Sequence, residues 1–226
     1  VATHGGEAAV GRLRARLGPL LAPPVPGPAE DRAADLRALA DPVQDTLLCL
    51  YSCRPNLDTR VSVLRQTWLP LLADMGVPVL IFVGGGDGRR EGDVVHLQAP
   101  DDYEGLPQKS LALARWVLEH TRFGHMVKVD DDCFLDPAAW FGDLAHRRYD
   151  YYGRRLHRVR GQMDRTWHMA KSQSARGRLE LDKSPEPSTY ADGGSGYALS
   201  RAAMQALCRA ADSPEGQGLT RLSFME

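Results

Sequence analysis

Three consecutive aspartates, Asp130–Asp132, follow an apolar run in the stretch HMVKVDDDCFLDPAAW. The run predicts a short buried strand, and the residues from Pro137 onward predict a helix that begins after Asp136. If the strand continued through the triplet, the first and third carboxylates would project to one side about 6.6 Å apart. At that separation they repel by about 2.5 kcal/mol with an effective dielectric of about 20, so a positive charge is expected beside them.

Paired carboxylates without a cluster of Cys or His ligands favour a hard divalent cation, Mn2+ or Mg2+, which keeps coordination positions open for phosphate oxygens. We therefore predict a metal site at Asp130 and Asp132. The alternative is that the triplet only interacts with the positive end of the following helix dipole. Because Asp136 is available as the helix cap, the metal site is the stronger interpretation.

Strand and helix patterns alternate along the chain from Thr46. This alternation predicts an α/β fold with a mostly parallel sheet and helices on both faces. Such sheets bind ligands at the carboxyl ends of their strands, where the triplet, Ser52 and the loop Gly84–Gly86 are expected to meet. The expected strands are 46–52, 77–86 including the glycine loop at its end, 93–100, 125–129 and 149–156. The expected helices are 57–68, 106–120 and 200–211, the last with Ser200 as its N-cap.

Lys109 falls on the apolar stripe of the helix that begins at residue 106, together with Leu113 and Val117. A lysine on a core-facing stripe needs a partner, because burying it unpaired is costly. The alternative is that its stem is buried while its ammonium group reaches solvent at the end of the helix. The sequence leaves both open.

Two arginines, Arg60 and Arg65, flank the inward face of the helix predicted for residues 57–68, near the strand end at Ser52. Guanidinium groups suit phosphate binding, so both are candidate ligands of a phosphate group. The alternative is that both are solvated.

Closely spaced glycines in YADGGSGYALS, residues 190–200, would let the backbone approach a ligand, although a sharp turn explains them equally. The preceding segment, 160–189, is polar and lacks periodicity. A loop of that length inside a domain is usually functional, so we expect it to cover a substrate.

The first 44 residues differ in pattern from the rest. Residues 6–21 have the composition of a short helix, and residues 22–28, APPVPGP, predict a semi-rigid connector. We therefore predict an extension, 1–44, and one domain, 45–226, for which 43% hydrophobic and 25% charged residues are an ordinary composition. The net charge of -1 gives no support for a nucleic-acid partner. No apolar run is long enough to span a membrane.

Several stretches together resemble the β-1,3-glycosyltransferase family, which includes galactosyltransferases, N-acetylgalactosaminyltransferases and fringe proteins. They are VLRQTW, DDYEGLPQKSLALARWV, VKVDDDCFLD, YADGGSGYALSRAAM and a terminal FME, in the order of the family. The resemblance covers residues 46–226. It implies a Rossmann-like GT-A fold and an inverting, metal-dependent transfer of a hexose or N-acetylhexosamine from a UDP-sugar to a hydroxyl of a glycan or glycoconjugate, in β-1,3 linkage.

The resemblance also assigns roles to particular residues. Asp132 would ligate Mn2+ or Mg2+ directly, and Asp130 with Asp131 would lie against the ribose and diphosphate. Arg65 and Lys109 would help to shape the donor pocket. The remaining members of the predicted binding set are Ser52, Arg60 and the glycines Gly193, Gly194 and Gly196, which would line the sugar or acceptor site.

The family's aspartate base follows the glutamate that is Glu226 here, so the domain is expected to be incomplete at its C-terminus. Glu226 and Asp192 are the candidate catalytic bases within the sequence. One alternative is a catalytically silent module that binds a nucleotide-sugar or glycan on the same fold. A metal-dependent phosphohydrolase is a weaker alternative, because DDDCF lacks the usual pattern around a nucleophilic aspartate.

The four cysteines lack the spacing of a zinc site, and the single asparagine, Asn56, is not an N-glycosylation acceptor. Free thiols favour a reducing compartment. We therefore expect a bacterial cytoplasmic protein, soluble or peripheral to a membrane, with the Golgi lumen as the alternative.

Overall fold

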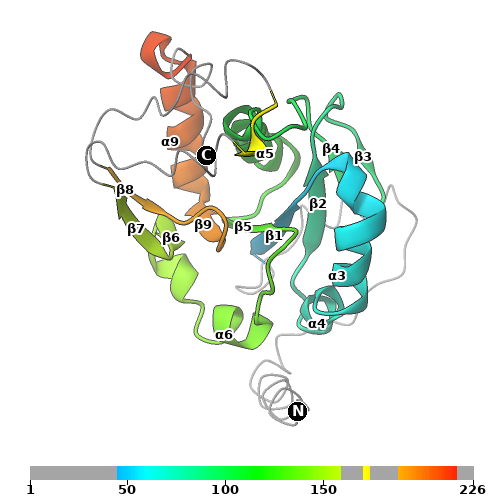
Figure 1. Ribbon diagram of the computed structural model, residues 1–226. Helices are drawn as coiled ribbons and strands as arrows, with labels where there is room; N and C mark the ends of the chain where they lie inside the picture. The colour runs from blue at the N-terminus through cyan, green and yellow to red at the C-terminus, as the bar shows by residue number, and fades with distance from the viewer. Residues whose placement is uncertain (1–44, 159–169, 174–187, 218–226) are drawn as a thin grey trace.

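A seven-stranded sheet with the order β3-β4-β2-β1-β5-β9-β6 forms the centre of the fold (Figure 1). The computed structural model describes residues 45–158, 170–173 and 188–217. A separate two-stranded sheet pairs β7 with β8. The strands are β1 (Thr46–Tyr51), β2 (Val79–Val83), β3 (Arg90–Glu91), β4 (Val94–His96), β5 (His125–Asp130), β6 (Tyr151–Gly153), β7 (Arg155–Arg158), β8 (Ser188–Ala191) and β9 (Tyr197–Ser200).

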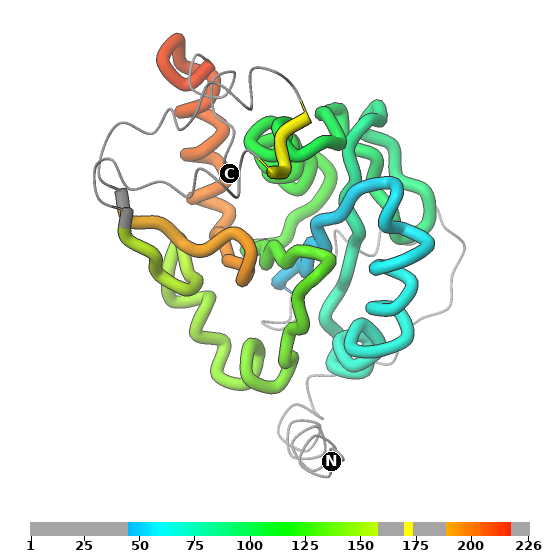
Figure 2. Tube along the Cα trace, in the orientation of Figure 1, coloured from blue at the N-terminus to red at the C-terminus, as the bar shows by residue number. Residues whose placement is uncertain are grey.

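Helices cover both faces of the main sheet. α3, α4 and α6 pack on one face, and α5 and α9 lie side by side on the other (Figures 1 and 2). The α/β prediction, with a mostly parallel sheet between helices, is therefore confirmed. The helical elements are η2 (a 3-10 turn, Arg54–Asn56), η3 (a π-helical turn, Leu57–Val61), α3 (Ser62–Gln66), α4 (Leu69–Asp74), α5 (Leu106–His120), α6 (Pro137–Phe141), η4 (a 3-10 turn, Ala145–Arg148) and α9 (Arg201–Asp212).

Strand β1 is buried along its whole length. Its side chains alternate between two cores, with Leu48 and Leu50 in the core that contains Trp68, and Leu47 and Cys49 in the core on the α5 side. A strand that is covered on both faces reads as a continuous apolar run, which is why TLLCLY shows no polar alternation.

The strands β4, β2, β1 and β5 are parallel, so their carboxyl ends lie at one edge of the sheet. Tyr51 is in register with both Phe82 and Asp130. Beyond it, Ser52 N donates to Phe82 O at 2.9 Å, and Asp131 N donates to Tyr51 O at 3.1 Å. The sheet therefore brings Ser52 and the triplet together, as expected.

The sheet differs from the sequence expectation at both edges. At one edge β3, which the sequence does not predict, is antiparallel to β4, and the other edge is formed by β9 and β6. β9 is antiparallel between β5 and β6, and the sequence does not predict it, because YALS is a short apolar segment between a glycine turn and a helix. The strand expected over 149–156 is divided: β6 joins the main sheet, while β7 pairs with β8. This side of the main sheet is therefore antiparallel.

Both predicted helix caps are confirmed. Asp136 Oδ1 accepts hydrogen bonds from Ala138 N at 2.9 Å and Ala139 N at 3.2 Å, at the start of α6. Ser200 Oγ accepts one from Ala203 N at 3.1 Å, at the start of α9. Each side chain satisfies amide groups that have no partner within the helix.

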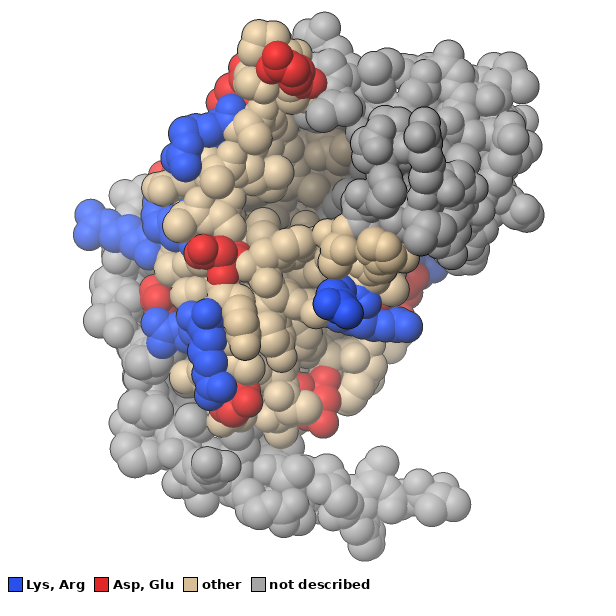
Figure 3. Space-filling view, turned by 90° about the vertical axis from the view of Figure 1, so that its left-hand side faces the viewer, with Lys and Arg blue, Asp and Glu red and all other residues tan. Residues whose placement is uncertain are grey.

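Residues 1–44 and nearly all of the segment 160–189 lie outside the described residues, so the domain boundary and the substrate-covering loop stay predictions. Among the helices that are described, none is long and apolar enough to cross a membrane. On the face shown in Figure 3, basic and acidic side chains are interspersed.

Candidate active site

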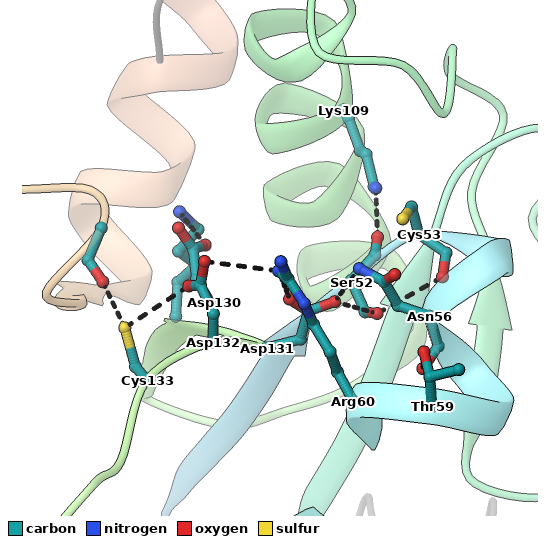
Figure 4. A network of polar contacts seen from close by, with 12 residues as sticks. Ser52, Cys53, Asn56, Thr59, Arg60, Lys109, Asp130, Asp131, Asp132 and Cys133 are labelled. Atoms are coloured by element: carbon teal, nitrogen blue, oxygen red, sulfur yellow. Dashed lines mark hydrogen bonds and ion pairs between the residues drawn. The ribbon is translucent and has the colours of Figure 1, made fainter. Parts of the chain in front are cut away.

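The aspartate triplet lies where β5 ends and the backbone turns. β5 ends at Asp130, and Cys133 N donates to Asp130 O at 3.2 Å, so Asp131 and Asp132 form a turn. The condition under which the first and third carboxylates would project to one side, a strand that continues through the triplet, is therefore not met. Instead of alternating sides, the second and third carboxylates share one cation, Arg60 (Figure 4).

Asp131 is buried and is held by three side chains from the segment after β1. Its Oδ2 accepts from Ser52 Oγ at 2.6 Å and from Asn56 Nδ2 at 2.8 Å. Its Oδ1 accepts from Arg60 Nη1 at 2.9 Å. Hydrogen bonds to an ionised carboxylate are stronger than neutral ones, so this cluster fixes the turn against η2 and η3.

Asp130 has its own cation. Lys128, two residues earlier on β5, places Nζ 2.8 Å from Asp130 Oδ1, since alternate residues of a strand share a face. The ammonium group also donates to Gly193 O at 3.1 Å and lies over the rings of Tyr51 and Tyr197. Lys128 and Arg60 thus supply the positive charge that the triplet requires.

Asp132 is the accessible member of the triplet, with 60% of its side chain exposed. Its Oδ2 lies 3.3 Å from Arg60 Nη1. The next residue, Cys133, donates from Sγ to Gly194 O at 2.6 Å. Burial, then the charges of Asp130 and Asp132, raises the pKa of the Cys133 thiol to about 11, so at neutral pH it is a hydrogen-bond donor.

The predicted glycine stretch folds into a turn at residues 192–196, the glycine turn, which lies against the triplet. Gly193 and Gly194 accept the hydrogen bonds from Lys128 and Cys133 described above. Gly196 has φ +88°, and a Cβ there would lie 2.8 Å from Lys128 O. Only glycine fits this backbone conformation and this close approach to β5.

Lys109 is buried and paired. Its Nζ lies 2.8 Å from Asp101 Oδ1 and also donates to Ser52 O. Of the two interpretations left open by the sequence, the core-facing lysine with a partner is therefore the one observed. Lys109 brings α5 into contact with the segment that holds Asp131.

Arg65 lies apart from the cluster, whereas Asp192 lies beside it and makes its hydrogen bonds within and next to the glycine turn. Arg65 Nη2 pairs with Asp93 Oδ1 at 2.6 Å, and Asp93 immediately precedes β4, at the edge of the sheet opposite the carboxyl ends. Asp192 lies in the glycine turn and accepts from Ser195 Oγ at 2.5 Å, Gly194 N at 3.2 Å and Arg154 Nη1 at 3.3 Å. Glu226 lies outside the described residues.

A family model described as Galactosyltransferase matches residues 59–215, more than half of the chain, including the triplet and the glycine turn. The chain belongs to the galactosyltransferase family. The predicted family resemblance is thereby confirmed, and the observed sheet and helices are consistent with a GT-A-like fold.

Curated relatives in the galactosyltransferase family are similar over a short segment. The mouse UDP-GalNAc:beta-1,3-N-acetylgalactosaminyltransferase 2 is 38% identical over 58 residues, 26% of this chain and 12% of the relative. The human protein of that name is 36% identical over the same length, and the Xenopus laevis protein is 43% identical over 44 residues. The match thus spans about an eighth of the relatives' length, and it supports a glycosyltransferase.

The expectation of a bacterial cytoplasmic protein is wrong, because these galactosyltransferase-family relatives are vertebrate proteins. All four cysteines, Cys49, Cys53, Cys133 and Cys208, are free thiols. Cys49 is buried in the core and Cys133 binds the glycine turn, so packing explains these two without reference to the redox state of a compartment.

Sequence reasoning missed several members of this galactosyltransferase-family site: Asn56, Asp101, Lys128 and Cys133. Lys128 could have been predicted from the sequence. It is a lysine inside the apolar run MVKV, and because it lies two residues before Asp130 it shares a face of the strand with that aspartate. Asp101 begins the stretch DDYEGLPQKSLALARWV, but the sequence assigns it no role, because its contacts with Arg54 N and Gly84 N join parts of the chain that are distant in sequence. Within the described residues, no group of three or more His, Cys, Asp or Glu side chains is arranged to hold a metal ion.

Proposed function

We propose that this chain is part of an inverting, metal-dependent glycosyltransferase that transfers a hexose or N-acetylhexosamine from a UDP-sugar to a glycan hydroxyl in β-1,3 linkage. The name of the relatives, UDP-GalNAc:beta-1,3-N-acetylgalactosaminyltransferase 2, makes N-acetylgalactosamine the first donor sugar to test. A Golgi lumen location, the second compartment considered from the sequence, is part of this proposal.

The observation that carries the proposal is the contrast within the triplet. Asp130 and Asp131 are neutralised by Lys128 and Arg60 and are largely enclosed, whereas 60% of the Asp132 side chain is exposed at the same edge of the sheet. A carboxylate held beside two fixed ion pairs, at the carboxyl ends of parallel strands, is placed to meet a charged ligand.

The donor set suits a hard cation that takes most of its ligands from the substrate. Asp132 would hold Mn2+ or Mg2+, with Asp130 beside it, and the few protein oxygens agree with a site completed by phosphate oxygens and water. When bound, the cation would stabilise the negative charge that develops on the departing diphosphate.

The chain's own residues would act on the donor and the acceptor. Arg60 presents a guanidinium group beside Asp132, where it would bind and orient a diphosphate. The glycine turn would let the backbone approach the sugar closely. A carboxylate would take the proton from the acceptor hydroxyl while the hydroxyl oxygen attacks the anomeric carbon. The attack comes on the face opposite the departing diphosphate, which inverts the configuration of that carbon. Asp192 and Glu226 are the candidates for this base.

Calorimetric titration with UDP, in Mn2+ and then in a chelator, tests the proposal. We expect binding only with the metal, and we expect Asp132→Ala to abolish it while the thermal unfolding temperature stays unchanged. Asp87→Ala is the matched control, because Asp87 is a similarly exposed aspartate paired with Arg89. Equal UDP affinity with and without the chelator would contradict metal-dependent binding.

A panel of UDP-sugars, assayed with glycan acceptors on the whole protein, tests the transfer. Incorporation of N-acetylhexosamine or hexose from one donor into the acceptor supports the proposed glycosyltransferase activity. Metal-dependent UDP binding without transfer from any donor would favour the silent binding module.

A further inference from the structure

Asp101 joins three separate segments at the carboxyl edge of the sheet. Its Oδ2 accepts from Arg54 N at 2.7 Å, and its Oδ1 accepts from Gly84 N at 2.6 Å and from Lys109 Nζ at 2.8 Å. Arg54 follows β1, Gly84 follows β2, and Lys109 belongs to α5. One carboxylate therefore fixes two strand ends and a helix at once.

The segment that carries Asp101 is pressed against the end of β2. A Cβ at Gly84 would lie 2.4 Å from Pro100 O, and Gly85 N donates to Ala99 O at 2.6 Å. Asp101 is thus fixed by its own backbone and is not a side chain that reaches across solvent. A residue that positions other residues needs a backbone that is itself held rigidly.

A short chain of contacts leads from Asp101 to the triplet. Asp101 neutralises Lys109, Lys109 Nζ donates to Ser52 O, and Ser52 Oγ donates to Asp131 Oδ2 at 2.6 Å. Ser52 is therefore held from one side by the lysine and bound on the other to the buried aspartate.

We propose that Asp101 is a positioning residue that holds the ends of β1 and β2 and Lys109 in the arrangement that presents the triplet to a nucleoside diphosphate. The ligand in this statement rests on the proposed function, whereas the positioning rests on the contacts alone. Burial acts to raise the pKa of Asp101, but the hydrogen bonds from Arg54 N, Lys109 and Gly84 N outweigh it, and the pKa lies below its usual value. The carboxylate is thus charged at neutral pH.

Amide hydrogen exchange, read residue by residue, tests the positioning without any ligand. In Asp101→Asn we expect the Arg54 and Gly84 amides to exchange about tenfold faster or more, since a hydrogen bond to a charged group contributes about 1.5–3 kcal/mol. The control is Asp93→Asn, which removes the charge from the Arg65 pair and leaves both amides unaffected. Unchanged exchange at both amides in Asp101→Asn overturns the proposal.

Asp101→Asn leaves Lys109 buried without a counter-charge, and this variant can fail to fold. The double variant Asp101→Asn, Lys109→Met removes both charges and is then used for the same exchange measurement. The expected loss of protection at Arg54 and Gly84 is the same, because neither amide binds Lys109.

UDP affinity, measured in Mn2+, separates positioning from stabilisation alone. We expect the Kd of folded Asp101→Asn to rise about tenfold, and its effect to be non-additive with that of Ser52→Ala, because both act through the same contact to Asp131. An unchanged Kd with a lowered unfolding temperature would mean that Asp101 only stabilises the fold. If the wild-type protein does not bind UDP, the proposed function fails. The amide exchange of Arg54 and Gly84 then decides by itself whether Asp101 positions the ends of β1 and β2.

Discussion

Lys128 and Asp130 form an ion pair of 2.8 Å from neighbouring positions on one face of β5, and the two partners differ in burial. The lysine side chain is 1% exposed and the aspartate side chain is 29% exposed. Removing the aspartate therefore leaves a fully buried cation, whereas removing the lysine leaves a carboxylate that solvent can reach.

We predict that Asp130→Ala lowers the free energy of unfolding by about 3–5 kcal/mol, the usual cost of removing one partner of a buried ion pair. Lys128→Met should lower it by less, about 1–3 kcal/mol, because water stabilises the remaining carboxylate. Urea denaturation of both variants measures the difference. The exposed pair Asp87–Arg89 is the control, where Asp87→Ala should change stability by less than about 1 kcal/mol. An equal or reversed order of the two β5 variants would contradict the asymmetry.

Arg60 and Arg65 provide a second, matched comparison. Both are partly exposed arginines paired with aspartates, but only Arg60 lies on the triplet. We predict that Arg60→Ala weakens UDP binding in Mn2+ by about tenfold or more, as expected for the loss of a charge-assisted phosphate contact. Arg65→Ala should leave the affinity within about twofold. Calorimetry on both variants measures the affinities. An effect of Arg65→Ala as large as that of Arg60→Ala would contradict the assignment of Arg60 as the phosphate-binding arginine.

The contrast between these arginines shows how far the sequence could predict the site. The parallel strands, α5 and both caps follow from local patterns. Because the carboxyl ends of neighbouring parallel strands lie side by side, Ser52 is then expected beside the triplet. The direction of a side chain on a short helical segment does not follow. Residues 54–66 combine 3-10, π and α turns, so the helical period that would place Arg60 and Arg65 is interrupted.

Tertiary contacts also decide the shape of the triplet. Extended geometry predicts alternation, but the partners of Asp131 come from the segment after β1, 71 to 79 residues away, and they draw the backbone into a turn. β9 was missed for a similar reason, since its antiparallel pairing with β5 is non-local. In both places pairing with distant residues determines the structure, and a single sequence carries little signal for it.

Asp192 is a candidate base whose contacts suggest a different role. Its carboxylate accepts from Gly194 N, Ser195 Oγ and Arg154 Nη1, all within its own turn or on the adjacent strand connection. We predict that Asp192→Asn lowers the transfer rate of the whole protein by less than tenfold. The reason is that the Asp192 side chain closes the glycine turn and is not the base that takes the proton from the acceptor. Loss of a true acid-base group costs about 100- to 10,000-fold. Arg154→Ala is the control for the loop contact, and a loss of 100-fold or more in Asp192→Asn alone would identify it as the base.

The pH dependence of stability should report on His146, at the opposite end of the sheet. His146 is fully buried, its Nε2 lies 3.0 Å from Thr46 Oγ1, and its Nδ1 has no hydrogen-bond partner among the described residues. Burial, followed by the charges of His125 and Arg147, lowers its pKa from 6.5 to about 4, against a smaller opposite effect of Asp143.

Because the folded state disfavours the imidazolium, the stability associated with neutral His146 is complete above the unfolded pKa of 6.5 and is lost as pH falls toward about 4. A shift of this size corresponds to about 3 kcal/mol over that range, at about 1.4 kcal/mol per pKa unit. Carboxylates also titrate there, so the informative quantity is the difference between wild type and His146→Gln in the free energy of unfolding, measured in urea from pH 7.5 to 4. We expect the wild type to lose more stability than the variant as the pH falls, with most of the divergence below pH 6.5. Parallel curves for the two proteins would show that His146 takes up its proton in the folded state as readily as in the unfolded chain.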